Sequence, residues 1–166
     1  MKIINVFQES LGKSRFIGLK YTNQDRDQYG SFGAKWMSWF KEKKFSSIEK
    51  LAIDSSSSYV GLMRSVPSFE YWIGVFCPEN TIVPDGYQYI DIKELNLGTC
   101  WLYGNERTGE LYGPKAHQAC EKSLVDAGMI IDQNGWCFER YVCPRFTKED
   151  EHGKVILDYC ITIKKK

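Results

Sequence analysis

The stretch WCFERYVC at residues 136–143 carries the most informative pattern in this 166-residue sequence. Its aromatic and β-branched residues are typical of a β-strand. Side chains alternate along a strand, so Glu139 and Tyr141 share one face, together with two cysteines. The other face carries Phe138 and Arg140. An acidic side chain is therefore predicted to lie among aromatic and thiol neighbours.

Two interpretations of Glu139 remain open from this pattern. If the carboxylate is buried, a cation of a bound ligand would offset its desolvation cost, and flanking aromatic rings would add a cation–π attraction of about 0.5–2 kcal/mol. Alternatively, Glu139 is an exposed strand residue paired with a lysine. Glu70 and Asp158 also fall in predicted strands. They could form a carboxylate pair with Glu139, although exposed ion pairs are the simpler expectation.

The first half of the chain predicts one strand, one helix and a hairpin. Residues 14–22 indicate a strand, and residues 29–44 indicate a helix with an aromatic face. The serine run at 55–58 is expected to be a loop. Residues 59–66 and 69–77 then form a hairpin around a Pro-Ser turn.

The second half repeats this order of elements. A strand is expected at residues 98–104, preceded by a short strand at 87–93. Residues 114–127 form a helix, because a proline opens the segment and a glycine follows its end. Strands are expected at residues 136–143 and 155–163.

We therefore predict a single α+β domain over residues 1–166, built from two β-α-β-β units. Two such units can join their strands in one antiparallel sheet with both helices on one face. A ligand cleft is expected on the other face, or at the seam between the units. Several of these strands are apolar on both sides, and a sheet face with nothing packed on it is normally polar.

Composition excludes several classes of function. The net charge is +1, so no electrostatic footprint for direct nucleic-acid binding is present. The six cysteines form no C-x-x-C pair and the chain has only two histidines, so no metal site and no cofactor are expected. No signal peptide and no apolar run long enough to cross a membrane is visible, which favours a cytoplasmic protein with reduced thiols.

Aromatic residues make up 14% of the chain, and they supply candidates for a binding pocket. Tyr59, Trp72 and Trp101 lie in predicted strands and could line a cavity. Trp36 and Trp39 lie on the predicted helix. For this helical pair a place in the hydrophobic core is the simpler alternative, because an aromatic stripe at helical spacing usually packs inward.

The order of these elements resembles the GyrI-like family, also called the AraC-type effector-binding or multidrug-regulator ligand-binding domain. That family has two β-α-β-β units and a late F-E-x-Y strand motif, which FERY at residues 138–141 matches. The opening Ile-Gly of the family is matched by Ile17-Gly18, and a strand before mid-chain by YWIGV at residues 71–75. The pattern covers nearly the whole chain.

The resemblance implies a bacterial, cytoplasmic effector-binding domain related to multidrug binding and transcription regulation. In the family the motif glutamate faces the ligand, which assigns this role to Glu139, with Tyr141 and the aromatic candidates around it. No helix-turn-helix region is expected before Ser14. The resemblance thus implies a stand-alone binding protein for small hydrophobic or cationic organic molecules, acting as a sensor, a sequestering protein or a resistance factor, with no membrane association.

Two further functions remain open. Some GyrI-like proteins resemble hydrolases that open strained cyclopropane rings of natural products, and Glu139 could serve such a reaction as a general base. Other members act as gyrase inhibitors by contacting a protein, so a gyrase subunit or a separate regulator is a conceivable partner. Nothing in the sequence separates a ligand-binding glutamate from a catalytic one.

Overall fold

The computed structural model describes residues 1–53 and 58–165. Within them the chain forms two successive β-β-α-β-β units. The first unit comprises β1 (Lys2–Leu11), β2 (Ser14–Tyr21), α1 (Gly33–Lys41), β3 (Tyr59–Arg64) and β4 (Glu70–Pro78). The second comprises β5 (Gln88–Ile92), β6 (Leu95–Gly104), α2 (Gly113–Asp126), β7 (Cys137–Tyr141) and β8 (Val155–Thr162). Four short 3-10 helices occur in the connections, at Asn23–Asp25, Lys44–Ser47, Glu49–Leu51 and Glu106–Thr108.

All eight strands of the described residues join one antiparallel sheet in the order β1-β6-β8-β7-β3-β4-β2-β5. This order is symmetric about the pairing of β7 with β3, which joins the two units. The first strand of each unit pairs with a strand of the other unit, because β1 pairs with β6 and β5 pairs with β2. The two units are therefore held together at the centre and at both edges of the sheet.

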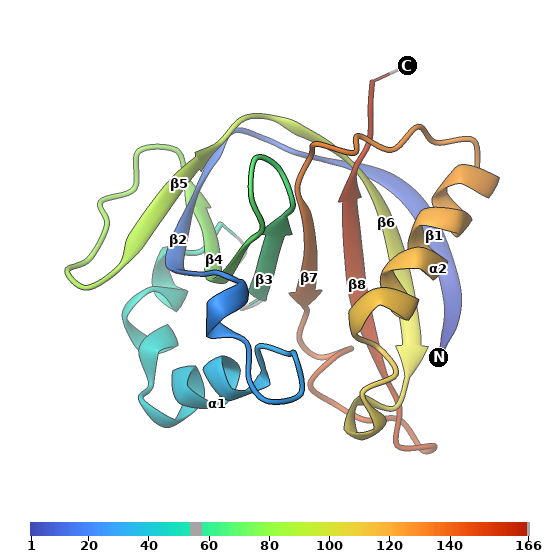
Figure 1. The fold of residues 1–166 in the computed structure, drawn as a ribbon, viewed down its shortest axis with the longest axis horizontal. Helices are drawn as coiled ribbons and strands as arrows, with labels where there is room; N and C mark the ends of the chain where they lie inside the picture. The colour runs from blue at the N-terminus through green and yellow to red at the C-terminus, as the bar shows by residue number, and fades with distance from the viewer. Residues whose placement is uncertain (54–57, 166) are drawn as a thin grey trace.

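Both helices lie on one side of the sheet, with β7 between them (Figure 1). The alternation of side chains explains this arrangement. On β4 the residues Tyr71 and Ile73 face α1 and pack with Trp39 of that helix. On β8 the residues Leu157 and Tyr159 face α2, whose own buried residues complete a second core cluster. Each helix thus covers its own half of the sheet.

The opposite face of the sheet carries a third apolar cluster. Phe16, Leu62, Trp72 and Phe138 are all at most 4% exposed there, although no α-helix covers them. Leu11 and the residues around the β5–β6 connection pack against this cluster, which agrees with the way the edge segments arch across the top of the sheet in Figure 1. The strands are apolar on both sides because each face of the sheet packs against a layer of the hydrophobic core.

The predicted α+β class, with an antiparallel sheet and both helices on one face, is confirmed. One strand is new: β1, for which the sequence analysis predicted nothing. It is an edge strand whose side chains are exposed or half-buried, so it carries no strong apolar alternation. The first helix is shorter than predicted and runs from Gly33 to Lys41. Most of the serine run at 55–58 lies outside the described residues.

No helix in the described part of the chain is long and apolar enough to cross a membrane.

Two glycines allow β2 and β4 to approach each other closely. Gly18 and Gly74 are opposite partners in this strand pair. A Cβ atom added to either glycine would lie closer than 3.0 Å to the backbone of the other strand. Both glycines follow isoleucines in the stretches that carry the family resemblance, so their close approach gives those Ile-Gly pairs a physical reason.

Replacing Gly74 by alanine should therefore destabilise the fold. Since backbone atoms cannot move aside as a flexible side chain can, we expect a loss of about 1–3 kcal/mol in the free energy of unfolding. Urea denaturation measures this loss. Gly12→Ala is the control, because an added Cβ at Gly12 meets nothing within 4 Å. Equal stability of the two variants would contradict this account of the strand pair.

Candidate functional site

The centre of the helix face, between α1 and α2, is occupied by Glu139 of β7. Its partner across the pairing with β3 is Gly61, and its partner across the pairing with β8 is Tyr159. Gly61 leaves room above the sheet, because a Cβ there would collide with the hydroxyl group of Tyr71 and lie 3.3 Å from the Glu139 carboxylate. The glycine therefore lets a tyrosine from β4 reach towards the acid.

Glu139 is buried, with only 7% of its surface exposed. The hydroxyl group of Tyr141 donates a hydrogen bond of 2.7 Å to Oε2 of Glu139, and the hydroxyl group of Tyr71 also hydrogen-bonds the carboxylate. Trp36 of α1 donates its indole N–H to the Tyr71 hydroxyl oxygen at 2.9 Å. A hydrogen-bonded chain thus runs from α1 to the buried acid.

Burial raises the pKa of Glu139 from 4.5 to about 7, and the hydrogen bonds from Tyr141 and Tyr71 offset only part of this effect. Within residues 1–53 and 58–165, no lysine, arginine or histidine forms an ion pair with Glu139. A buried carboxylate without a basic partner is costly and rare. Such a group is a candidate for function.

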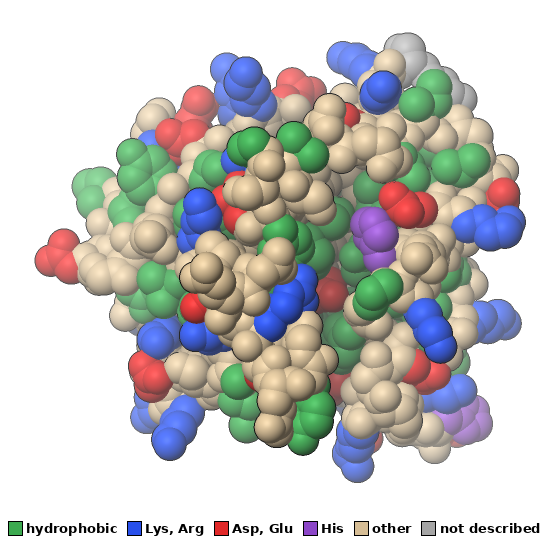
Figure 2. All heavy atoms as spheres, viewed as in Figure 1, with side chains coloured by type: hydrophobic (Ala, Val, Ile, Leu, Met, Phe, Trp, Pro, Cys, Tyr) green, Lys and Arg blue, Asp and Glu red, His purple; other side chains and the backbone are tan. Residues whose placement is uncertain are grey.

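Aromatic side chains form walls around this acid. The ring of Trp36 meets the ring of Tyr141 edge to face, with centroids 4.9 Å apart, and Phe146 packs on the other side of Tyr141 at 4.7 Å. Half-buried Tyr112 lies next to the start of α2, and burial, followed by the charges of Glu106 and Glu139, raises its pKa. Figure 2 shows the surface hollowed between the two helices, with hydrophobic and acidic atoms inside the hollow. We call this hollow the central groove.

Of the predicted pocket residues, Glu139, Tyr141 and Trp36 come together in the central groove. Tyr59 lies beside Tyr141 in the sheet, but its ring stacks on Phe45 at 3.6 Å and its hydroxyl group donates to Glu49. Tyr59 therefore packs beside the central groove and does not line it. Trp39 is fully buried and donates its indole N–H to Tyr21. It is therefore a residue of the hydrophobic core, which was the alternative to a place in the pocket.

Trp72 and Trp101 do not join this group, because both lie on the opposite face of the sheet. Trp72 is 4% exposed and donates its indole N–H to Glu70. Trp101 is half-buried, meets Phe7 edge to face, and has the guanidinium of Arg145 over its ring at 5.0 Å. Neither can contact a ligand that also contacts Glu139.

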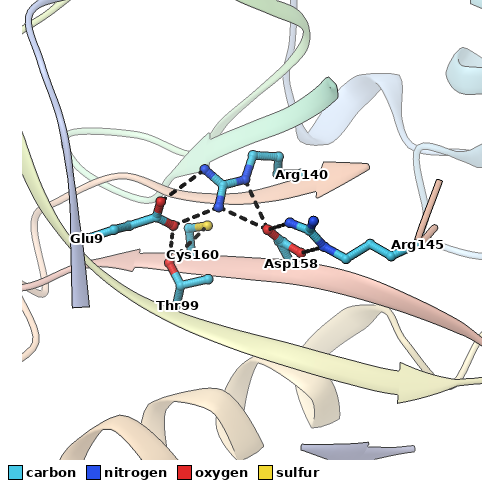
Figure 3. A network of polar contacts seen from close by, with 6 residues as sticks. All are labelled: Glu9, Thr99, Arg140, Arg145, Asp158 and Cys160. Carbon is cyan, nitrogen blue, oxygen red and sulfur yellow. Dashed lines mark hydrogen bonds and ion pairs between the residues drawn. The ribbon is translucent and has the colours of Figure 1, made fainter. Parts of the chain in front are cut away.

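The other two strand acids are buried as well, which differs from the expectation of exposed ion pairs. Asp158 is 0% exposed and accepts hydrogen bonds from both Arg140 and Arg145 in the network of Figure 3. Glu70 is 6% exposed and pairs with Arg64 at 2.5 Å. Both lie on the opposite face from Glu139, so no carboxylate pair forms with it. These two acids are structural, because each has its own basic partner.

Several residues of the site were not predicted, namely Tyr71, Tyr159, Gly61, Tyr112 and Phe146. Tyr71 stands next to Trp72 in the sequence, and the choice between them depends on which strand face points to the helices. The pairing of Gly61 with Glu139 settles that choice, since partners across a sheet share a face. The alternation along the strand shows that Tyr71 and Trp72 face opposite sides of the sheet. The pairing of the strands is needed to decide which of the two faces the helices.

Another surface depression of the described residues lies at the β5 edge. It has a volume of about 490 Å³ and is lined by Lys13, Glu79, Asp91, Ile92, Lys93 and Glu94. Charges of both signs alternate there and no aromatic ring faces it. The central groove, with its buried unpaired acid, is therefore the better candidate site.

Comparison with known proteins supports the fold assignment. No protein-family model and no curated protein matches the chain. A solved structure of SAV2435 bound to tetraphenylphosphonium is similar, with a TM-score of 0.73 and 14% identity over 97% of this chain and 94% of that chain. A candidate bacterial transcription regulation protein from Staphylococcus aureus MU50 has a TM-score of 0.64 and 16% identity, covering 98% of this chain and 99% of its own.

A third similar structure is EcmrR in complex with DNA, with a TM-score of 0.63 and 10% identity. The match covers 98% of this chain and 58% of the EcmrR chain. At these identities the likeness shows a shared fold.

The pKa of Glu139 predicts how stability depends on pH. The folded protein holds the proton up to about pH 7, whereas the unfolded chain releases it near 4.5. The contribution of Glu139 to stability is therefore fully present below about pH 4.5 and is lost as the pH rises to about 7, with a total cost of about 3 kcal/mol above that range. Glu139→Gln should remove this cost. We expect the variant to unfold at a higher temperature than the unmodified protein at pH 8, and at a similar temperature at pH 5.

Glu70→Gln is the matched control for these thermal melts. Its hydrogen bonds to Trp72 and Arg64 lower the pKa of Glu70 despite its burial, so the ionised form contributes stability above pH 4.5. This variant should be less stable than the unmodified protein at pH 8. Parallel pH profiles for the Glu139 variant and the unmodified protein would show that Glu139 is not titrating as described.

Proposed function

We propose that this chain binds small aromatic organic cations in the central groove, with Glu139 as the counter-charge. The observation that carries the proposal is a buried carboxylate with neutral tyrosine donors, no basic partner and an aromatic wall. We further propose that the chain is a GyrI-like effector-binding domain, acting as a sensor, a sequestering protein or a resistance factor.

A cation in the groove would replace the missing basic partner of Glu139. In water-excluded surroundings the attraction between the two charges is stronger than at the surface. Trp36 and Tyr141 would add cation–π contacts of about 0.5–2 kcal/mol. A bound cation would also lower the pKa of Glu139, so binding and loss of its proton would be linked.

The structural neighbours support this chemistry. SAV2435 binds tetraphenylphosphonium, a large aromatic cation, within the same fold. EcmrR is a DNA-bound protein with a domain of this fold, which fits a role as the sensing part of a regulator. For this chain we propose the ligand class of the first protein, because its own groove offers the required charge and rings.

Titration with tetraphenylphosphonium, followed by tryptophan fluorescence at pH 8, tests the proposal. We expect saturable quenching in the unmodified protein, because Trp36 lies in the groove wall. Glu139→Gln should weaken binding at least about 10-fold, equivalent to about 1.4 kcal/mol. Binding of neutral triphenylphosphine oxide should change less than about 3-fold. The affinity for the cation should also rise from pH 6 to pH 8 as Glu139 ionises.

Glu70→Gln serves as the control, because it removes a buried acid from the opposite face of the sheet. It should leave both affinities unchanged. Equal losses for the cation and the neutral compound in Glu139→Gln would refute the role of the charge, and absence of quenching by either compound would refute the groove as their site.

A second candidate function rests on the pKa of Glu139 of about 7, which suits a general base near neutral pH. The carboxylate would take a proton from a water molecule whose oxygen bonds to a ring carbon as the strained C–C bond breaks. The electron pair of that bond would pass to the electron-accepting group of the substrate, which then receives the proton from Glu139, while Tyr141 orients the reacting groups. Incubation with a cyclopropane-containing electrophile, followed by chromatography, would reveal the ring-opened product. Glu139→Gln should abolish its formation, and product formation at an unchanged rate would eliminate this candidate.

A further inference from the structure

A second, smaller pocket lies beside α2 on the helix face. Its volume is about 100 Å³, room for about three water molecules or an aminoalkyl end group. The residues that matter for its chemistry are His117, Glu121, Asp132, Trp136, Cys137 and Ile161. We call it the α2 pocket.

Two residues place the α2 pocket next to the residues of the central groove. Cys137 lines the pocket and lies two positions before Glu139 on the same strand, so both face the helices. Tyr159 is the partner of Glu139 across the sheet, and its hydroxyl oxygen lies 3.0 Å from Nδ1 of His117, which lines the pocket. The α2 pocket therefore lies beside the part of the central groove that holds Glu139. Figure 2 shows a histidine on the α2 side of the same hollow.

The α2 pocket offers hydrogen-bond acceptors and negative charge. His117 Nδ1 lies 3.0 Å from the Tyr159 hydroxyl oxygen, and its Nε2 lies 3.4 Å from Oε1 of Glu121. Asp132 adds a second carboxylate, whereas no lysine or arginine is among the residues lining the pocket. The lining therefore carries two carboxylates, and its histidine contacts one of them.

We infer that the α2 pocket is a subsite for a hydrogen-bond-donating ammonium group on the ligand. The inference rests on the proposed function, since the aromatic cationic body of the same ligand would lie over Glu139. The favoured ligands are thus elongated aromatic cations with an aminoalkyl arm. The N–H groups of the arm would donate to Glu121 and the ring nitrogen of His117. A cation without N–H groups would fill only the central groove.

The size of the pocket supports this class of ligand. A pocket of about 100 Å³ is sufficient for a short chain with a terminal ammonium group. Its apolar member Ile161, which packs in the core cluster of α2, can contact the methylene groups of the arm. The carboxylates at the wall then meet the charged end. Both the size and the charge of the α2 pocket therefore favour a short aminoalkyl arm.

The test uses N-alkylacridinium salts whose chains end in an ammonium, a hydroxyl or a methyl group, each with two to five methylenes. Binding is measured at pH 8 and physiological salt by displacement of tetraphenylphosphonium. In the unmodified protein we expect the ammonium series to bind about 10-fold more tightly than the methyl series at the optimal chain length. The hydroxyl series should lie between them. In Glu121→Gln the advantage should fall below about 2-fold.

Asp126→Asn is the matched control. It removes one negative charge from the same helix, but Asp126 is exposed and pairs with Lys122 away from the pocket. Because long-range attraction is screened at this salt concentration, this variant should keep the full ammonium advantage. Loss of the advantage in Asp126→Asn as well would overturn the subsite and indicate a general charge effect.

Two other outcomes separate this inference from the proposed function. If the ammonium and methyl series bind equally and both weaken in Glu139→Gln, the subsite is overturned and the proposed function stands. If neither series nor tetraphenylphosphonium binds, the proposed function fails and the subsite fails with it. A maximum in affinity at one chain length, present only in the ammonium series, supports the subsite.

Discussion

The pairing of β7 with β3 is the constraint on which this structure depends. It joins two units that each cover their own half of the sheet with one helix, so the space between the helices falls directly above this strand pair. The pairing also sets Glu139 opposite Gly61, which removes the only side chain that could fill the space from the β3 side at that level. A shift by one residue would turn Glu139 to the opposite face and bring Arg140 to the groove.

The buried acids on the two faces of the sheet differ in whether they have basic partners. On the face away from the helices, Asp158 is buried together with two arginines, and Glu70 with one. On the helix face, the donors to Glu139 among residues 1–53 and 58–165 are neutral hydroxyl groups. The same chain therefore neutralises its buried acids where they hold strands together and leaves one unneutralised where the surface is hollowed. This contrast within one sheet distinguishes a site from a structural ion pair.

The sequence predicted most of the fold but only part of the site. Pro114 and Gly128 mark the ends of the second helix, and apolar runs mark the central strands, because these signals are local. The edge strand β1 lacks such a signal, since its pairing with β6 connects residues about 90 positions apart. Glu139 was found from its motif, yet Trp72 was chosen in place of Tyr71. Both strand faces are apolar there, so alternation could not decide which of the two neighbours faces the helices.

The tyrosines explain how an unpaired acid can be kept in the groove. An arginine would stabilise the carboxylate more strongly, but it would also cancel the charge that a cationic ligand needs. Phenylalanine would leave the carboxylate without donors at a larger cost. A tyrosine hydroxyl donates one hydrogen bond and stays neutral, because burial beside Glu139 raises the pKa of Tyr71 and Tyr141 well above their ordinary value. The surroundings of Glu139 therefore reduce the cost of burial without removing its charge, which is the compromise that a binding site for cations requires.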